Sequence, residues 1–489
     1  MSVPVAVDRL PNGFAVRIRD DVRQNQGKEG SVVLVGGSPL RAMALAPAAR
    51  RLVEGGTVEV TDETSATVAR RLLDANLADP VLAAGVEPEE ITVVVPVRDR
   101  PEQLDRCLRV LAGIAVIVVD DASLDPDTVA GVAARHGAAF VLLPVNLGPA
   151  GARNAGLCEV GTPYVAFVDS DVTVEAKTLL TLAGHLHDPL VALAGPLVRG
   201  MVRSARPKWF ERFDAASSSL ALGDRACSVK PGAAVGWLPS ACLVGRTSTL
   251  LDAGGFAEQM RVGEDVDLVW RLVAAGRRVR YEPALEACHD VRDSIAGWLG
   301  RKVAYGSGGA ALAERHGDAV AVARLTPLMA AAGAGLLMRK RWSLLGAAVA
   351  TGWAARTVHR ALPEFEGRRA SAAALAARGL GWAARQESAL LLRHWWPAAA
   401  VLATVSPTAR RAMASAVVVD AIVAATVDRP LRRDDSPRLG LAEVALGRRL
   451  DDLAYGLGLW SGALRRRSWR ALAIAITRTG TNKRGLPRS

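Results

Sequence analysis

Between residues 91 and 171 the sequence alternates short apolar runs with helix-forming segments. Apolar runs occupy residues 91–97, 115–119, 140–143 and 164–168, and helical segments occupy 102–111 and 127–135. This alternation predicts a parallel sheet covered by helices, because parallel neighbours need a crossover connection that is usually a helix. Ligands of such α/β sheets bind beyond the carboxyl ends of the strands, so the residues that follow each run are the candidate site residues.

The 489 residues are too many for one ordinary core, and the sequence pattern divides them into three parts. Residues 14–45 give three short strand-like runs, and two short helical segments follow them before Pro80. We therefore predict a small α+β module of winged-helix type at residues 1–85, an α/β domain at 90–315 and a helical region at 320–489.

The net charge of +12 is concentrated in the C-terminal region. Residues 331–489 carry 26 Lys+Arg against 10 Asp+Glu, a net +16, which leaves residues 1–330 at −4. The α/β domain thus has no positive excess with which to follow a phosphate backbone, and nucleic-acid binding is disfavoured. The five scattered cysteines suit reduced thiols, and charged residues interrupt the N-terminus so that no signal peptide is visible. We expect a cytoplasmic protein.

Beyond residue 320 the sequence is rich in Ala, Leu, Arg and Trp. Its apolar stretches at 326–338, 342–355 and 412–427 fall short of the roughly 18 uncharged residues of a transmembrane helix. Apolar faces with interleaved Arg and Trp suit helices that lie on an anionic membrane at the inner face of the cell. A helical bundle with solvated arginines fits equally well, and both alternatives stay open.

The first two strands are predicted to end in residues that border a nucleotide. Pro96 is expected to stop the first ladder, so that Arg98 emerges on the loop, and Asp120 and Asp121 follow the second strand. A carboxylate at this edge can accept hydrogen bonds from uracil or ribose. The alternative is that one of the two carboxylates caps the next helix.

A glycine-rich stretch, NLGPAGARNAG at residues 146–156, follows the third strand. Gly148, Gly151 and Gly156 are expected to let the backbone approach a ligand, and Arg153 and Asn154 then lie at a helix start suited to a diphosphate or ribose. Such turns are common, and the position after the third strand is what gives this one weight.

The fourth run leads directly into Asp169-Ser170-Asp171. Two carboxylates two residues apart at a strand end can reach one divalent cation and the nucleotide bound to it. Oxygen ligands that are completed by donor phosphates suit Mg²⁺ or Mn²⁺. Loop capping is the alternative reading of this D-x-D pattern.

Further along, GEDVDL at 263–268 places Glu264 and Asp265 at a predicted helix start, where the helix dipole favours an ionised carboxylate. A base at this point can take a proton from an acceptor hydroxyl. Capping by either residue is the alternative. His289 follows a later strand-like segment and is a candidate metal or diphosphate contact, although a lone histidine is more often structural.

In this order the motifs VVVPVRDR, VVDDAS, NLGPAGARNAG, VDSDV, GEDVDL and CHD resemble those of the family 2 glycosyltransferases of GT-A fold, over residues 90–290. The resemblance implies a nucleotide sugar bordered by Pro96, Arg98, Asp120, Asp121, Gly148, Arg153, Asn154 and Asp169. It also implies a metal held by Asp169, Asp171 and His289, and Asp265 as catalytic base with Glu264 beside it.

The wider chain resembles the mycofactocin branch of that family, on the stretches LVGGSPLRAMALAPAARRLVEGG and LLDANLADP of a peptide-recognition-like module. That branch implies UDP-glucose as donor, β-linked transfer, and a peptide-derived redox cofactor or its precursor as acceptor. No Q-x-x-R-W sequence follows Trp270, which disfavours a processive polysaccharide synthase, and Arg301-Lys302 are expected to contact the leaving diphosphate instead. The alternatives are a glycosyltransferase acting on a cell-envelope glycolipid and an inactive peptide-binding scaffold.

Overall fold

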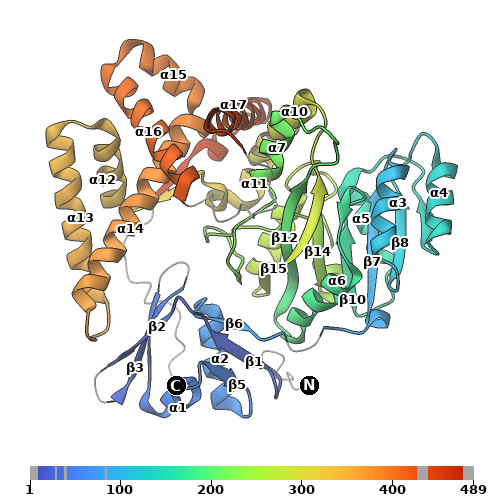
Figure 1. Cartoon of the computed structure of the whole chain (residues 1–489), viewed down its shortest axis with the longest axis horizontal. Coiled ribbons are helices and arrows are strands. Elements are labelled where there is room, and N and C mark those ends of the chain that lie inside the picture. The colour runs from blue at the N-terminus through green and yellow to red at the C-terminus, as the bar shows by residue number, and fades with distance from the viewer. Residues whose placement is uncertain (1–8, 28–29, 38–40, 83–84, 427–438, 477–489) are drawn as a thin grey trace. The chain divides into compact units, whose positions relative to one another are not determined.

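The computed structural model describes residues 9–27, 30–37, 41–82, 85–426 and 439–476 (Figure 1). The chain forms two compact units, one from Met1–Arg301 with Pro430–Gly447 and the other from Lys302–Arg429 with Arg448–Ser489. The three-part division at residues 1–85, 90–315 and 320–489 stays a prediction.

The first unit begins with a small α+β module, drawn in blue in Figure 1. One sheet has the order β5-β1-β6 and the other β2-β3-β4. The bounds are β1 (Ala15–Ile18), β2 (Arg23–Gln26), β3 (Val32–Gly36), β4 (Arg41–Leu45), α1 (Pro47–Val53), β5 (Thr57–Glu59), α2 (Glu63–Asp74) and β6 (Ala78–Pro80). The predicted runs are confirmed, whereas β2, β5 and β6 were not predicted, because they are short or, like RQNQ in β2, lack an apolar pattern.

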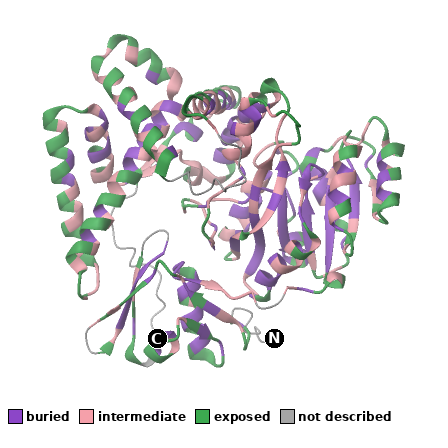
Figure 2. Cartoon of the chain, in the orientation of Figure 1, coloured by how far each residue is buried: buried purple, intermediate pink, exposed green. Residues whose placement is uncertain are grey.

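A mixed nine-stranded sheet forms the body of the first unit. Its order is β11-β15-β12-β14-β10-β7-β8-β9, with β13 paired to β15. The bounds are β7 (Ile91–Val97), β8 (Ala115–Asp120), β9 (Ala139–Leu142), β10 (Tyr164–Val168), β11 (Val172–Thr173), β12 (Val191–Met201), β13 (Cys227–Ser228), β14 (Cys242–Arg246) and β15 (Arg278–Asp290). Strands β10, β7, β8 and β9 are parallel neighbours, which confirms the predicted parallel arrangement. The middle strands β7 and β10 are almost wholly buried (Figure 2), as parallel strands usually are.

Helices connect these strands. They are α3 (Pro101–Val110), α4 (Pro126–Arg135), α5 (Gly148–Cys158), α6 (Ala176–Ala183), α7 (Trp209–Ala216), α8 (Thr247–Asp252) and α9 (Glu264–Ala274). Because β10, β7 and β8 are adjacent and parallel, the loops that lead from them into this helical layer emerge at one edge of the sheet.

The prediction that Pro96 stops its ladder is wrong. Strand β7 continues to Val97, with Pro96 opposite Val119 of β8. On its other side β7 pairs with β10 only as far as Val94, so the N–H that proline lacks is not needed there.

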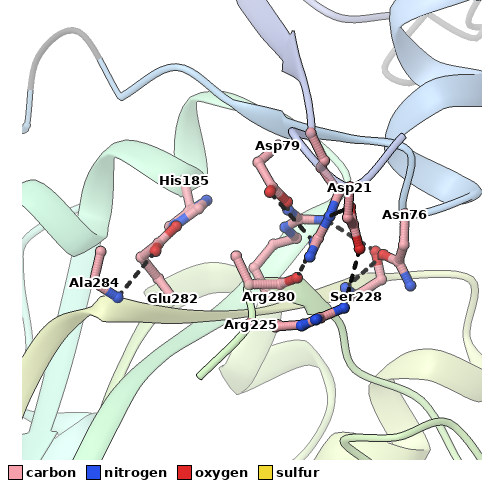
Figure 3. A network of polar contacts seen from close by, with 11 residues as sticks. Asp21, Asn76, Asp79, His185, Arg225, Ser228, Arg280, Glu282 and Ala284 are labelled. Carbon is pink, nitrogen blue, oxygen red and sulfur yellow. Dashed lines mark hydrogen bonds and ion pairs between the residues drawn. The ribbon is translucent and has the colours of Figure 1, made fainter. Parts of the chain in front are cut away.

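Within the first unit, polar contacts join the N-terminal module to β13 and β15 (Figure 3). Arg280 donates hydrogen bonds to Ser228 Oγ at 3.0 Å and to Asp79 Oδ1 at 3.2 Å. The Ser228 backbone N–H donates to Asn76 Oδ1 at 3.0 Å. Arg280 is buried, so its charge requires the Asp79 carboxylate as a partner. These contacts make the module an integral part of the first unit.

A second buried pair, also visible in Figure 3, lies beside this network. His185 Nε2 is 3.4 Å from Glu282 Oε2, and the Glu282 carboxylate also accepts a hydrogen bond from the Ala284 backbone N–H. Burial lowers the pKa of His185 below its ordinary value, so the neutral ring is favoured at this position.

The second unit is mainly helical, as predicted. Its elements are α11 (Gly309–His316), β16 (Ala323–Leu325), α12 (Pro327–Met338), α13 (Arg341–Ala361), α14 (Arg368–Ala389), α15 (Trp396–Val405), α16 (Pro407–Thr426) and β17 (Ile474–Ile476), and β16 pairs with β17. Helices α10 (Ile295–Ser307) and α17 (Leu441–Arg465) contribute residues to both units. Of the helices in the described part of the chain, none is long and apolar enough to cross a bilayer.

Gly156 was predicted to let the backbone approach a ligand, and the structure gives it a packing role instead. A Cβ added there would lie 2.3 Å from Val94 Cγ1 and 3.0 Å from Val119 Cγ2, so glycine allows α5 to pack closely on β7 and β8. We expect Gly156→Ala to destabilise the fold by about 1–3 kcal/mol, the usual cost of overpacking a core. Thermal unfolding measures this loss.

Gly131→Ala in α4 is the matched control, because a Cβ added there meets nothing within 4 Å. Alanine in an open helical position is expected to be neutral or slightly stabilising. Equal melting temperatures of the two variants would contradict the packing role of Gly156.

Candidate active site

The loops after β7 and β8 lie side by side at the carboxyl edge of the sheet. The Asp99 backbone N–H donates to Ser123 Oγ at 2.9 Å, and the Leu124 N–H donates to Asp99 Oδ1 at 2.7 Å. Arg98 lies at the same edge. It is exposed, it follows Val97 at the end of β7, and its Nε is 3.5 Å from Asp99 Oδ2. The structure therefore brings the residues that follow these two strands together.

Asp120 and Asp121 have different environments. Both are buried, and Asp120 Oδ1 accepts a hydrogen bond from the Ser123 N–H at 2.9 Å. Its Oδ2 has no hydrogen-bond partner within the described ranges, and leaving a buried carboxylate oxygen unpaired costs free energy. Asp121 uses both oxygens to accept the N–H groups of Leu147 and Gly148, at 2.6 and 2.9 Å. Of the two, Asp120 keeps one buried oxygen without a partner among the described residues, while Asp121 caps the start of α5.

Gly148 begins α5 with a φ of +78°, a backbone conformation that favours glycine. A Cβ added to it would lie 2.6 Å from Arg261 Nη1, the mobile end of a long side chain, so the positive φ is the stronger reason for glycine here. The group it accommodates is a protein side chain, because Arg261 also donates to Asn146 Oδ1 at 2.8 Å.

Asn154, predicted to contact the donor, binds protein groups. Its Oδ1 accepts the Phe256 N–H at 2.8 Å, and its Nδ2 donates to the Phe256 carbonyl and to Glu258, both at 2.9 Å. These three bonds hold the loop that precedes α9.

Arg153 joins two of the predicted motifs. Its side chain is 3% exposed, and it donates from Nη2 to Asp169 Oδ1 at 2.5 Å and from Nη1 to Glu264 Oε1 at 3.1 Å. Burial alone would lower the pKa of Arg153, but the charges of Asp169 and Glu264 outweigh it and hold the pKa above its ordinary value. The guanidinium therefore serves as a charged clamp between the D-x-D loop and the start of α9, rather than as a group free for the donor.

Asp171 lies beside His289 among positive charges. Its Oδ1 is 3.6 Å from His289 Nε2, and its Oδ2 accepts a hydrogen bond from Arg100 at 2.7 Å and lies 3.9 Å from Arg292. Burial would raise the pKa of Asp171, but the charges of His289, Arg100 and Arg301 outweigh it and keep the carboxylate ionised.

Asp169, by contrast, has one carboxylate oxygen directed to Arg153. Among the residues that the structure describes, no three His, Cys, Asp or Glu side chains are grouped so as to hold a metal. The three predicted metal contacts thus divide into the Asp171–His289 pair and an Asp169 that is bound to an arginine.

Glu264 and Asp265 begin α9 without capping it. The N-cap is Gly263, whose φ of +85° suits glycine, and Asp265 accepts hydrogen bonds from the Val266 N–H at 2.8 Å and the Ser240 N–H at 3.3 Å. The Ser240 hydroxyl lies 3.4 Å from Glu264 Oε1. Both carboxyl groups therefore contact Ser240, which lies on the loop before β14.

The expected ionisation of Asp265 needs correction. The helix dipole was predicted to favour the charged form, yet burial and the charge of Glu264 raise the pKa of Asp265 to about 7. The hydrogen bonds from Val266 and Ser240 only reduce this effect. A carboxyl with a pKa near neutrality is suited to general-base work.

Comparison with known proteins identifies the family. The family model described as Glycosyl transferase family 2 matches residues 92–223, and the model Glycosyl transferase family group 2 matches residues 164–405. The chain is also 42% identical to the pre-mycofactocin glycosyltransferase of Mycobacterium tuberculosis strain H37Rv, over 96% of this chain and 99% of that one. This chain is a family 2 glycosyltransferase. The predicted GT-A class, with an α+β module before it and a helical region after it, is confirmed.

More distant similarities were also found among curated proteins and solved structures. An N-acetylglucosaminyltransferase of Sinorhizobium fredii is 26% identical over 46% of this chain and 58% of its own. Among solved structures, the mannosyltransferase PcManGT from Pyrobaculum calidifontis in complex with GDP-Man and Mn²⁺ is 16% identical, covers 77% of this chain and 90% of its own, and has a TM-score of 0.40.

Several groups of the candidate site were not predicted in their present roles. Arg100 and Arg292 contact Asp171 from two different loops, and Ser240 contacts both Glu264 and Asp265. The loop position of Arg100 was a usable signal, because it follows the first strand. Ser240 lies 25 residues before Asp265, and no local pattern marks it.

The two basic residues predicted to contact the diphosphate also differ. Arg301 Nη1 lies 3.0 Å from His289 Nε2. Lys302 is buried, with Nζ 2.8 Å from Asp451, so its charge is neutralised inside the second unit. Only Arg301 remains a candidate for the diphosphate.

Replacing Arg153 tests the clamp. We expect Arg153→Met to destabilise the glycosyltransferase by about 2–4 kcal/mol, because Asp169 and Glu264 would lose their shared partner in a largely buried place. Denaturant unfolding measures the change. Arg98→Met, which removes an exposed pair, should cost about 1 kcal/mol or less. Similar losses in the two variants would contradict the clamp.

Proposed function

We propose that this glycosyltransferase is an inverting, metal-dependent hexosyltransferase that moves glucose from UDP-glucose, in β-linkage, to a peptide-derived redox cofactor or its precursor. The name of the relative that is 42% identical, a pre-mycofactocin glycosyltransferase, supports this acceptor. The single observation that carries the chemistry is the Arg153 clamp, because it fixes the D-x-D loop next to the loop of the proposed base.

The carboxyl edge of the sheet provides the groups for a nucleotide diphosphate. Asp120 Oδ2, buried and unpaired among the described residues, can accept a hydrogen bond from the N–H of a uracil. Arg100, Arg292 and Arg301 gather around Asp171 and His289, and together they carry more positive charge than the one carboxylate neutralises. This excess suits a diphosphate. In this proposal Pro96, Arg98 and Gly148 belong to the neighbouring loops that border the nucleotide.

Asp171 and His289 are the residues that would hold a divalent metal. A carboxylate oxygen and an imidazole nitrogen 3.6 Å apart suit Mg²⁺ or Mn²⁺ when donor phosphates and water supply the other ligands, since such ions often use only one or two carboxylates of the protein. Asp169 joins the site through its second carboxylate oxygen. A bound metal would supply positive charge that stabilises the departing diphosphate.

Asp265 is the proposed base. The acceptor hydroxyl oxygen forms a bond to the anomeric carbon while the bond from that carbon to the diphosphate oxygen breaks. The hydroxyl proton passes to the Asp265 carboxylate, and UDP leaves with the bonding electron pair. Attack on the face opposite the leaving group inverts the configuration. Ser240 and Val266 hold the carboxylate in position with their N–H groups.

Removing the base tests this assignment. We expect Asp265→Asn to fold and to bind UDP, but to transfer sugar about 10²-fold or more slowly, which is typical of general-base loss. Release of UDP and calorimetric UDP binding are the two measurements. Asp252→Asn, an exposed change on α8, is the control and should keep normal turnover. Near-normal turnover of Asp265→Asn would remove Asp265 from the mechanism.

The raised pKa of Asp265 gives a pH dependence. The base must be deprotonated to act, so kcat/KM is expected to rise about tenfold per pH unit below pH 7 and to level off above it. Asp252→Asn should retain this profile. A profile that is flat between pH 5 and pH 8 in the wild-type enzyme would contradict the pKa assignment.

Mass spectra of the reaction products identify donor and acceptor together. Each of a panel of UDP-sugars is incubated with two acceptors, a peptide-derived precursor of the mycofactocin type and a glycolipid. The proposal expects a mass increase of one or more hexoses on the peptide-derived acceptor with UDP-glucose. The basic, tryptophan-containing helical unit favours a second candidate, a cell-envelope glycolipid acceptor, and a mass shift on the glycolipid alone would establish it. We propose a cytoplasmic location for both candidates, with contact to the inner face of the membrane for the second. An inactive scaffold would produce a mass shift on neither acceptor.

A further inference from the structure

Helix α13 (Arg341–Ala361) has an apolar stripe that faces away from the protein. Trp342, Leu345, Val349 and Trp353 have exposed fractions of 69%, 55%, 63% and 65%. Their spacing of three, four and four residues places them on one face of the helix, and the two tryptophans are about 16 Å apart along its axis. Four exposed large side chains in a row differ from the isolated exposed apolar residues that are normal on protein surfaces.

The opposite face of α13 is packed inside the second unit. Ala347 and Ala350 are buried in a cluster with Ala332 of α12, and Leu380 of α14 packs against that cluster. Ser343 Oγ donates to the Gly335 carbonyl of α12 at 2.8 Å. The helix is therefore anchored through its small residues, and the stripe is left for something outside the described part of the chain.

Positive charges flank the stripe at both ends. Arg339, Lys340 and Arg341 precede it, Arg356 and Arg360 follow it, and residues 327–361 contain no Asp or Glu. All five side chains are exposed, and the Arg341 guanidinium lies 5.2 Å from the centre of the Trp342 ring. An apolar, tryptophan-bearing face with cations at both ends is complementary to a bilayer that has apolar acyl chains beneath anionic headgroups.

We propose that α13 is a membrane-docking helix that lies along an anionic bilayer with Trp342, Leu345, Val349 and Trp353 at the boundary of the acyl chains. A spanning orientation does not fit, because no described helix is long and apolar enough to cross a membrane. A second copy of the chain fits poorly, because a symmetric contact would bring the same basic clusters together in either helix direction. The inference adds the contact surface to the proposed location, and it does not depend on the transferase chemistry.

Vesicle co-flotation of the full-length chain tests the proposal. Wild-type protein should bind vesicles that contain phosphatidylglycerol, and should bind at least tenfold less to pure phosphatidylcholine vesicles. Raising the ionic strength from about 0.1 M to 0.5 M should weaken the binding, because salt screens the basic clusters. Equal binding to both vesicle types, or binding to neither, would overturn the proposal.

Variants locate the contact. Trp342→Gln with Trp353→Gln is expected to reduce binding to anionic vesicles at least tenfold, and Arg356→Gln with Arg360→Gln to reduce it severalfold. Leu464→Gln, an exposed apolar residue on α17, is the matched control and should bind as the wild type does. Unchanged circular dichroism and unchanged UDP release would show that these surface changes leave the fold and the transferase intact.

Two results would reject α13 as the docking helix. One is tight vesicle binding by the double tryptophan variant. The other is that neither protein binds vesicles, while light scattering gives the double tryptophan variant a lower particle mass than the wild type. That result would identify the stripe as a contact between copies of the chain. Loss of vesicle binding with normal sugar transfer would support docking whatever the acceptor proves to be.

Discussion

The ion pairs of Arg153 are the contacts on which the rest of the site depends. The D-x-D loop follows β10 and the proposed base begins α9, and 95 residues separate Asp169 from Glu264 in the sequence. One buried guanidinium forms ion pairs with both carboxylates. Without that positive charge, two loops with several acidic residues would repel each other in a place that water reaches poorly. The clamp thus holds the loop that carries Asp171 close to the start of α9, where the proposed base lies.

Strand-end motifs could be predicted from the sequence because the necessary information is local. The apolar run of β10 leads directly into Asp169, and the order of strands places that residue at the carboxyl edge of the parallel strands. The partner of each side chain could not be predicted in this way. Asn154 bonds to Phe256 and Asp121 bonds to Leu147, and both contacts join segments that only the folded chain brings together. Residues of types suited to a nucleotide were therefore predicted at the correct edge of the sheet, but several of them form hydrogen bonds to neighbouring loops of the protein.

Asp265 shows the same limit for electrostatics. Its position at a helix start is visible in the sequence, and the dipole at such a position favours an ionised carboxylate by about 0.3–1 kcal/mol. Burial and the neighbouring Glu264 act in the opposite direction, and they raise the pKa to about 7. The environment therefore outweighs the local effect of the helix dipole. Only the folded structure reveals the depth of burial that decides this balance.

The segment from residue 223 to residue 240 gives the N-terminal module a part in the same site. Near its start, Arg19 of the module donates to the Ala226 carbonyl at 2.6 Å. Near its end, Trp270 Nε1 donates to the Gly236 carbonyl at 2.7 Å, and the Ser240 N–H donates to Asp265. The segment that holds the proposed base is therefore held in turn by the module. Contacts inside the first unit thus connect the N-terminal module, through this segment, to the position of Asp265.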